Sequence, residues 1–230
     1  VVTVTGHKGT KLYNGEEHKV TGYDVAISNP LYTASDFRFS GTAEATGTNA
    51  DTYEMGLAAG QFQNTNENFA SVEFTVEDGS LTVSPRRVLL TSEGGSKPYD
   101  GTALTKPVVT VEGDGFVEGE VTDIRATGSV TYVSEGEVTN TIEYTEGEKF
   151  QASNYSIEKN EGKLSITAST EKVSVTIRGH KGTELYNGEE HKAKGYDVAI
   201  SNPLYTEGDF RFSGTAEAKG TNADTYEMGL

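Results

Sequence analysis

Apolar and polar residues alternate along most of the chain. In the stretch VEFTVEDGSLTV, residues 72–83, every second residue is apolar on both sides of an Asp-Gly pair. Alternation of period two predicts β-strands with one buried face, and Asp-Gly between two such runs predicts a hairpin turn. The stretch NYSIEKNEGKLSI, residues 154–166, repeats this arrangement, and residues 128–138 and 172–179 also alternate. The pattern therefore predicts an all-β protein.

The sequence leaves two alternatives for the fold of each β unit. No window of the chain carries a helical stripe of apolar residues, which favours small β-sandwich modules of immunoglobulin-like type. A β-grasp-like module is the alternative and requires a helix. The segment TYEMGLAAGQFQ, residues 52–63, is the only candidate for that helix, and its two glycines weaken it.

Internal repetition is the strongest feature of the sequence. Residues 6–57 align without a gap with residues 179–230, and 46 of these 52 positions are identical. A weaker repeat with a period of about 86 residues relates Tyr13-Asn14-Gly15 to Tyr99-Asp100-Gly101. Self-similarity at a fixed period indicates an array of similar structural modules.

These alignments divide the chain into three repeats. We expect a first repeat of type A at residues 1–85, a second repeat of type B at 86–170, and a third repeat, again of type A, at 171–230. The linkers around residues 82–88 and 167–173 are short and polar, which predicts modules joined in an elongated string with limited interfaces. The third repeat contains no counterpart of residues 58–85, so we expect it to need further strands, from a continuing chain or from a neighbouring chain.

A short motif occurs once in each repeat, as Tyr followed by Asn or Asp and then Gly. Asn and Asp tolerate positive φ and Gly adopts it at little cost, so the motif predicts a turn. We expect the tyrosine ring to enter the core while its hydroxyl stays near the surface. The asparagines at the equivalent positions cannot act as a general base or nucleophile, which argues against a catalytic role for Asp100. The predicted turn residues are Tyr13, Asn14, Gly15, Tyr99, Asp100, Gly101, Tyr186, Asn187 and Gly188.

The second repeat resembles a known family of modules. Its pattern is Lys-x-Tyr-Asp-Gly, then Asn-Tyr-x-Ile about 55 residues later, then Gly-x-Leu-x-Ile. This resembles the YDG/MBG-type tandem repeats of Gram-positive bacterial cell-surface proteins, and the type A repeats are similar to a sister type. The residues that carry the resemblance are Lys97, Tyr99, Asp100, Gly101, Asn154, Tyr155, Ile157, Gly162, Leu164 and Ile166.

The resemblance implies an extracellular protein attached to the cell wall, in which the repeats form a stalk or an adhesive arm. It supplies no catalytic residues. Wall attachment would come from parts of the protein outside these 230 residues, since no anchor motif or sorting signal is present in them.

The composition of the chain argues against several classes of binding partner. The chain has 35 Asp and Glu against 19 Lys and Arg, a net charge of −16, which argues against nucleic acid or an anionic membrane surface. There is no Cys, which excludes disulfides and thiolate chemistry, and no apolar run reaches the length of a membrane span. Solubility explains the acidity; Ca²⁺ at a module junction is the alternative, although no EF-hand loop is present. The candidate carboxylates are Glu16, Glu17, Asp51, Glu77, Asp78, Glu118 and Glu120.

Two further sites are candidates for chemistry. The histidines form two equivalent pairs, His7 with His18 and His180 with His191, and would need supporting carboxylates to bind zinc. Lys97 and Asn154 are the candidate pair for a Lys–Asn isopeptide crosslink, which needs a buried Lys and Asn on adjacent strands. The alternative role for Asn154 is to fix a turn by bonding to the backbone. We expect no other cofactor.

These observations favour a structural function over an enzymatic one. We expect a monomeric stalk or spacer in an adhesin, with the neighbouring modules as its first partners. The alternative is a module that itself binds host mucin, another glycan or a surface protein. Its tyrosines would then provide a stacking platform, with the loop NPLYT at residues 29–33 and 202–206 as the candidate.

Overall fold

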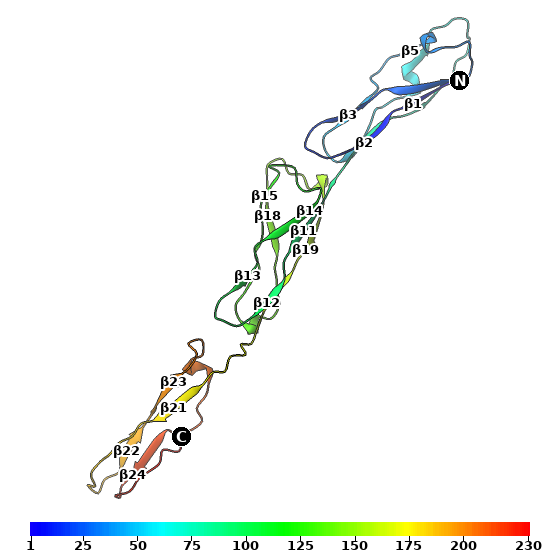
Figure 1. Cartoon of the computed structure of the whole chain (residues 1–230). Helices are drawn as coiled ribbons and strands as arrows, with labels where there is room; N and C mark the ends of the chain where they lie inside the picture. Colours follow the sequence, from blue (N-terminus) through cyan, green and yellow to red (C-terminus); the bar gives the residue numbers. More distant parts are fainter. The chain divides into compact units, whose positions relative to one another are not determined.

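The computed structural model describes all residues from Val1 to Leu230 and is built from strands (Figure 1). Its only helices are five 3-10 turns of three residues each: η1 (Ala34–Asp36), η2 (Ala59–Gln61), η3 (Val133–Glu135), η4 (Ala152–Asn154) and η5 (Glu207–Asp209). None of them has the length and apolar character needed to cross a bilayer. The all-β prediction is confirmed.

The strands follow the alternating segments. The first repeat contains β1 (Val2–Gly6), β2 (Lys8–Leu12), β3 (His18–Thr21), β4 (Tyr23–Ile27), β5 (Phe37–Phe39), β6 (Glu44–Gly47), β7 (Asp51–Glu54), β8 (Phe62–Asn64), β9 (Phe74–Glu77) and β10 (Ser80–Ser84). The second contains β11 (Arg86–Ser92), β12 (Gly95–Pro98), β13 (Leu104–Thr105), β14 (Val109–Gly113), β15 (Val121–Ala126), β16 (Ser129–Val130), β17 (Val138–Thr139), β18 (Ile142–Glu146), β19 (Tyr155–Asn160) and β20 (Lys163–Thr167). The third contains β21 (Val175–Gly179), β22 (His191–Lys194), β23 (Tyr196–Ile200) and β24 (Glu217–Gly220).

The first two repeats share one scheme of strand pairing. In the first repeat the sheets are β4-β1-β9, β2-β10-β7, β3-β6 and β5-β8, and in the second they are β14-β11-β19, β12-β20-β17, β13-β16 and β15-β18. Each strand of the second repeat therefore has a counterpart ten places earlier. The third repeat contains the pairs β21-β23 and β22-β24, which correspond to β1-β4 and β3-β6.

The predicted helix over residues 52–63 is absent. Strand β7 ends at Glu54, and η2 and β8 occupy the second half of the segment. Gly56 lies between them with φ of 76°, a conformation outside any right-handed helix. The β-grasp alternative therefore loses its only candidate helix.

The predicted hairpin over residues 72–83 is wrong in its pairing, although both strands form. Strand β9 pairs parallel with β1, from Val2 opposite Phe74, and β10 pairs parallel with β2, from Lys8 opposite Ser80. The two strands thus lie in different sheets at one constant register. Residues 154–166 repeat this outcome, since β19 pairs with β11 and β20 with β12 and β17. Local alternation specified the strands, whereas their partners come from the distant start of each repeat.

The hydrophobic core extends across the predicted boundary at residue 85. One cluster, formed by Val2, Val4, Tyr32 and Phe62, lies within the first repeat. A second cluster runs from the first repeat into the second and includes Leu81 and Val83 of β10 and Val88 and Leu90 of β11. Only Pro85 separates these two strands, so the expected polar linker at residues 82–88 is instead strand and core.

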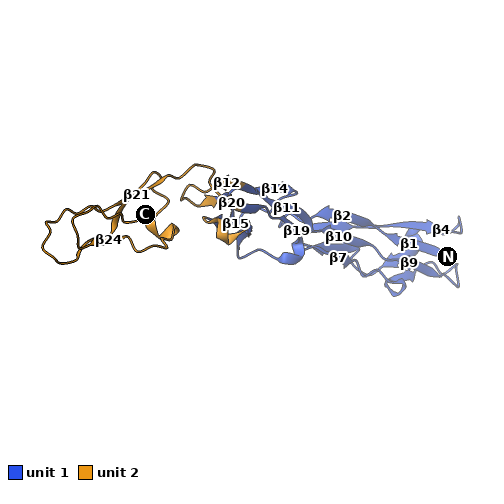
Figure 2. Ribbon diagram, turned by 90° about the horizontal axis from the view of Figure 1, so that it is seen from below, with its two compact units in different colours: residues 1–95, 105–130, 137–164 blue, residues 96–104, 131–136, 165–230 orange.

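The chain forms two compact units (Figure 2). One comprises residues 1–95, 105–130 and 137–164, and the other comprises residues 96–104, 131–136 and 165–230. Every sheet lies within a single repeat, yet one compact unit is made entirely of residues from the first two repeats. The division into three domains at residues 85 and 170 stays a prediction.

Candidate functional site

The three predicted turns have the same local geometry. Gly15 and Gly101 each have φ of 81° and Gly188 has φ of 85°, a region that L-residues with a side chain rarely adopt. The preceding side chain accepts a hydrogen bond from the backbone two residues later in each case. These bonds run from Glu16 to Asn14 Oδ1, from Thr102 to Asp100 Oδ1 and from Glu189 to Asn187 Oδ1, all at 2.9 Å.

Tyr13 extends from the first of these turns into the second repeat. Only 3% of the residue is exposed, and its hydroxyl donates a hydrogen bond of 2.6 Å to Glu120 Oε1. The expectation of a surface hydroxyl is therefore wrong for Tyr13. The reason is that its partner is a buried carboxylate from another repeat, which a local pattern cannot reveal.

Glu120 also accepts a hydrogen bond from a tyrosine of its own repeat. The Tyr155 hydroxyl donates to Glu120 Oε2 at 2.7 Å and accepts from the backbone N–H of Val117 at 3.1 Å. The rings of Tyr13 and Tyr155 meet edge to face, with centroids 5.7 Å apart. One buried carboxylate thus joins two buried phenols, an arrangement that we call the Glu120 junction.

The Glu120 junction strongly favours neutral phenols. Burial, followed by the hydrogen bond to the Glu120 carboxylate, raises the pKa of Tyr13 to about 12. The same two causes raise the pKa of Tyr155. Both phenols therefore remain hydrogen-bond donors at neutral pH, which leaves the carboxylate satisfied although it is buried.

Further hydrogen bonds from Asn154 and Arg86 join the second repeat to the first. Asn154, which is fully buried, donates from Nδ2 to Asn49 Oδ1 at 3.0 Å and accepts from the N–H of Ala50 at 2.7 Å. Asn49 and Ala50 belong to the turn between β6 and β7. Arg86 donates to the carbonyls of Tyr13 and Gly115, at 3.2 Å and 2.7 Å. Two turns of the first repeat are therefore bound by the second.

Lys97 and Asn154 make hydrogen bonds to different partners. Lys97 Nζ donates to Asp100 Oδ1 at 2.9 Å and to Thr102 Oγ1 at 2.6 Å, whereas Asn154 is bound to Asn49 and Ala50. The hydrogen bond from Lys97 lowers the pKa of Asp100 to about 2. Each member of the proposed isopeptide pair thus has a different set of partners.

The other two motif tyrosines have different surroundings. Tyr99 is partly exposed and lies beside Tyr132, with ring centroids 6.2 Å apart. Tyr186 is 68% exposed, although its heptapeptide LYNGEEH is identical to the one that contains Tyr13. The burial of this tyrosine is therefore set by what covers it and not by its own sequence.

The two histidines of each pair have different surroundings. His180 lies against the Lys194 carbonyl and Asp197, whereas His191 lies against Asn187 Oδ1. His7 Nδ1 lies 2.8 Å from the Thr21 carbonyl and its Nε2 lies 3.4 Å from Asp24, while His18 Nε2 is buried without a hydrogen-bond partner. No group of three or more His, Asp or Glu side chains is placed to hold a metal ion.

Three of the acidic residues considered for Ca²⁺ have other partners. Glu77 pairs with Lys8 at 2.8 Å, and Asp78 accepts hydrogen bonds from three backbone N–H groups. Glu120 accepts from the two buried tyrosines. Of these residues only Glu120 acquires a role at a module junction, and that role is to bind phenols.

The NPLYT loop does not present its tyrosine as a stacking platform in the first repeat. Tyr32 is 5% exposed, its ring packs edge to face on Phe69, and its hydroxyl donates to the Asp36 carbonyl and Asn64 Oδ1. Tyr205, its counterpart, is partly exposed and donates to the Asp209 carbonyl at 2.9 Å. Leu31 of this loop is 78% exposed.

Comparison of the chain with protein-family models, with curated proteins and with solved structures found no match. The resemblance to YDG/MBG-type repeats therefore stays a prediction from the sequence.

Proposed function

We propose that the chain is a non-catalytic repeat region of a bacterial cell-surface protein and acts as a stalk or spacer within an adhesin. In this proposal the repeats are tandem β-sandwich modules of immunoglobulin-like type, located outside the cell. The order of the YDG-type motifs in the second repeat supports the extracellular assignment, and the all-β fold is compatible with it.

The Glu120 junction is the observation that carries the proposal. A spacer must resist bending between its modules, and a buried hydrogen-bonded network with a continuous apolar core does so more effectively than a polar linker. Here the carboxylate of Glu120 binds the motif tyrosine of the first repeat at 2.6 Å and a core tyrosine of the second at 2.7 Å. The Tyr-Asn-Gly turn of the first repeat then has a function, which is to present a tyrosine to the following module.

The rigidity of this junction can be measured directly. The chain has no cysteine, so Ser71→Cys and Ser129→Cys, both at exposed positions, introduce two unique sites for spin labels. Double electron–electron resonance should give a narrow distance distribution between the labels. Tyr13→Ala should broaden it, because the contact with Glu120 and Tyr155 is lost, and Tyr186→Ala should leave it unchanged. A broad distribution in the parent chain would contradict the proposal.

Direct recognition of host mucin, glycan or protein is the alternative. It predicts saturable binding of the purified chain to a glycan array or to immobilised mucin. The spacer proposal predicts none. Binding that disappears when an exposed loop residue such as Leu31 is replaced by Asp would favour the alternative.

A further inference from the structure

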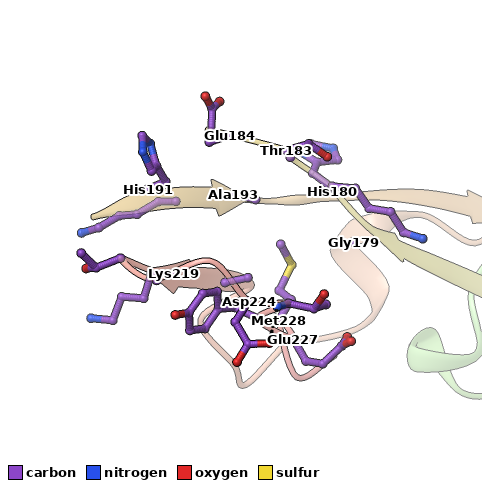
Figure 3. Close-up of a pocket in the computed structure, with 18 of the residues that line it drawn as sticks. Gly179, His180, Thr183, Glu184, His191, Ala193, Lys219, Asp224, Glu227 and Met228 are labelled. Carbon is purple, nitrogen blue, oxygen red and sulfur yellow. Dashed lines mark hydrogen bonds between the residues drawn. The ribbon is translucent and has the colours of Figure 1, made fainter. Parts of the chain in front are cut away.

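The third repeat carries an open groove of about 760 Å³ (Figure 3). It is lined by residues 179–184, 191–193 and 218–230 together with Tyr186. Figure 3 shows the Met228 side chain directed into the space between the segment with Ala193 and the segment with Asp224. The groove therefore runs between stretches of chain that are far apart in sequence.

The first repeat shows what these same residues hold. The equivalents of residues 181–185 and 224–227 are β2 (Lys8–Leu12) and β7 (Asp51–Glu54), and β10 lies between them. Strand β10 pairs parallel with β2 and antiparallel with β7. Its two apolar side chains are buried there, with 0% of Leu81 and 2% of Val83 exposed.

In the third repeat the corresponding backbone and apolar groups are uncovered. Residues 181–185 and 224–227 are not strands, although they differ from β2 and β7 only by Glu184 in place of Lys11. Leu230 is 53% exposed, against 6% for its equivalent Leu57. Unpaired strand backbone beside exposed apolar side chains is the arrangement to which an additional strand binds.

The floor of the groove can accept a strand. In the first repeat Leu81 lies opposite Gly9, and a Cβ placed on Gly9 would lie 2.6 Å from a methyl group of Val20. In the third repeat a Cβ placed on the equivalent Gly182 would lie 3.6 Å from the Cβ of Ala193. The side chain beneath this glycine is therefore shorter in the third repeat. Lys181 is also present to pair with an acidic residue, as Lys8 does with Glu77 at 2.8 Å.

We propose that this groove is the acceptor site for one β-strand of the type formed by β10, residues 80–84. The bound strand would run parallel to residues 181–185 and antiparallel to residues 224–227. Its leucine, equivalent to Leu81, would lie opposite Gly182 and Tyr226, in the register that the first repeat uses. This inference does not rest on the stalk function, because a groove can accept a strand whether or not the Glu120 junction is rigid.

The test uses the full chain and a fluorescent peptide with the sequence of residues 72–85, VEFTVEDGSLTVSP. Anisotropy titration should show saturable binding of one peptide per chain. A Leu81→Asp peptide should bind at least about tenfold more weakly, because its carboxylate would enter an apolar site. A Gly79→Val peptide should also bind more weakly by a similar factor. In the first repeat a Cβ on Gly79 would lie 2.5 Å from the His7 carbonyl oxygen.

Amide hydrogen exchange then locates the peptide. Protection should increase in residues 181–185 and 224–227 and stay unchanged in residues 8–12 and 51–54, where β10 already lies. Absence of saturable binding, equal binding of the Leu81→Asp peptide, or protection elsewhere would overturn the proposal. Association of the chain with itself that the peptide does not reduce would also overturn it.

A second variant tests the same proposal without a free peptide, in case the peptide is poorly soluble. The full chain is extended at Leu230 with a copy of residues 58–85, and the expected result is the same protection in residues 181–185 and 224–227. The matched control carries Asp at the position equivalent to Leu81. An extended chain without new protection in these two segments would overturn the proposal.

Discussion

At the scale of single residues, Tyr13 and Tyr186 show that the same local sequence can place a tyrosine in a core or at the surface. Both follow the same leucine and precede the same five residues, and both turns contain a glycine with positive φ. Yet Tyr13 is buried against Tyr155 and Glu120, whereas Tyr186 is 68% exposed. The turn has the same geometry in each case, but only Tyr13 is covered by neighbouring side chains and becomes part of a core.

The hydroxyl of Tyr13 gives a prediction about pH. The pKa of Tyr13 is raised to about 12 from its ordinary value of 10, so its contribution to stability is complete below pH 10 and disappears as pH rises through 12. Tyr13→Phe removes a hydrogen bond to a charged group and should cost about 1.5–3 kcal/mol at pH 8. Denaturant unfolding of both proteins should show this difference shrinking between pH 10 and 12.

The equivalent change in the third repeat is the control for this experiment. Tyr186→Phe should leave the free energy of unfolding unchanged at every pH, because the Tyr186 hydroxyl has no carboxylate partner. A difference between the parent chain and Tyr13→Phe that persists undiminished to pH 12 would contradict the assignment.

At the scale of elements, each complete repeat depends on a crossover between two sheets. In the first repeat the chain passes from β9 to β10 at Asp78 and Gly79. Asp78 accepts hydrogen bonds from the N–H groups of Gly56, Leu57 and Gly79, at 2.8 to 2.9 Å. The Asp-Gly pair that resembles a hairpin turn therefore fixes the segment after β7 to the crossover.

Removal of this carboxylate should destabilise the first repeat. Asp78→Ala leaves partly buried backbone N–H groups without an acceptor and should reduce the free energy of unfolding by about 1–3 kcal/mol. Asp78→Asn keeps one acceptor oxygen and should lose less. The neighbouring exposed change Glu73→Ala is the control, since no side-chain partner of Glu73 is present. Equal midpoints for Asp78→Ala and Glu73→Ala in urea unfolding would contradict the role of Asp78.

At the scale of the whole molecule, the compact units do not coincide with the sequence repeats. The apolar cluster that includes Val83, Val88 and Tyr155 runs through both of the first two repeats. Domains that share a core and a buried hydrogen-bond network should unfold together. The expectation of modules with only limited polar contact is therefore wrong for the first pair.

This coupling predicts a single unfolding transition for residues 1–164. Glu120→Ala leaves two buried hydroxyl groups without their acceptor, at about 1–3 kcal/mol each, and should lower the stability of both repeats together. Hydrogen exchange resolved along the sequence should show the same loss in β10 and in β19, with no loss in β21 and β23. Destabilisation confined to the second repeat would show that the two repeats unfold independently.

The sequence by itself determined the repeats, the strands and the turns. Alternation places Leu81 and Val83 on a buried face, and a Tyr-Asn/Asp-Gly motif requires positive φ at its glycine, because these properties depend on residues close together in the chain. The same reasoning considered Glu120 only as a calcium ligand and missed Asn49. A carboxylate in a loop carries no local sign that two tyrosines, 107 and 35 residues away in sequence, will cover it.

Tertiary structure alone decided which strands pair and which side chains are buried. Strands β9 and β10 are adjacent in sequence, but β9 pairs with β1, and β10 pairs with β2 and β7. Residues 8–12 and 51–54 are strands, whereas their near-identical counterparts at 181–185 and 224–227 are not. A strand is completed by hydrogen bonds to its neighbours, and those neighbours are specified elsewhere in the chain.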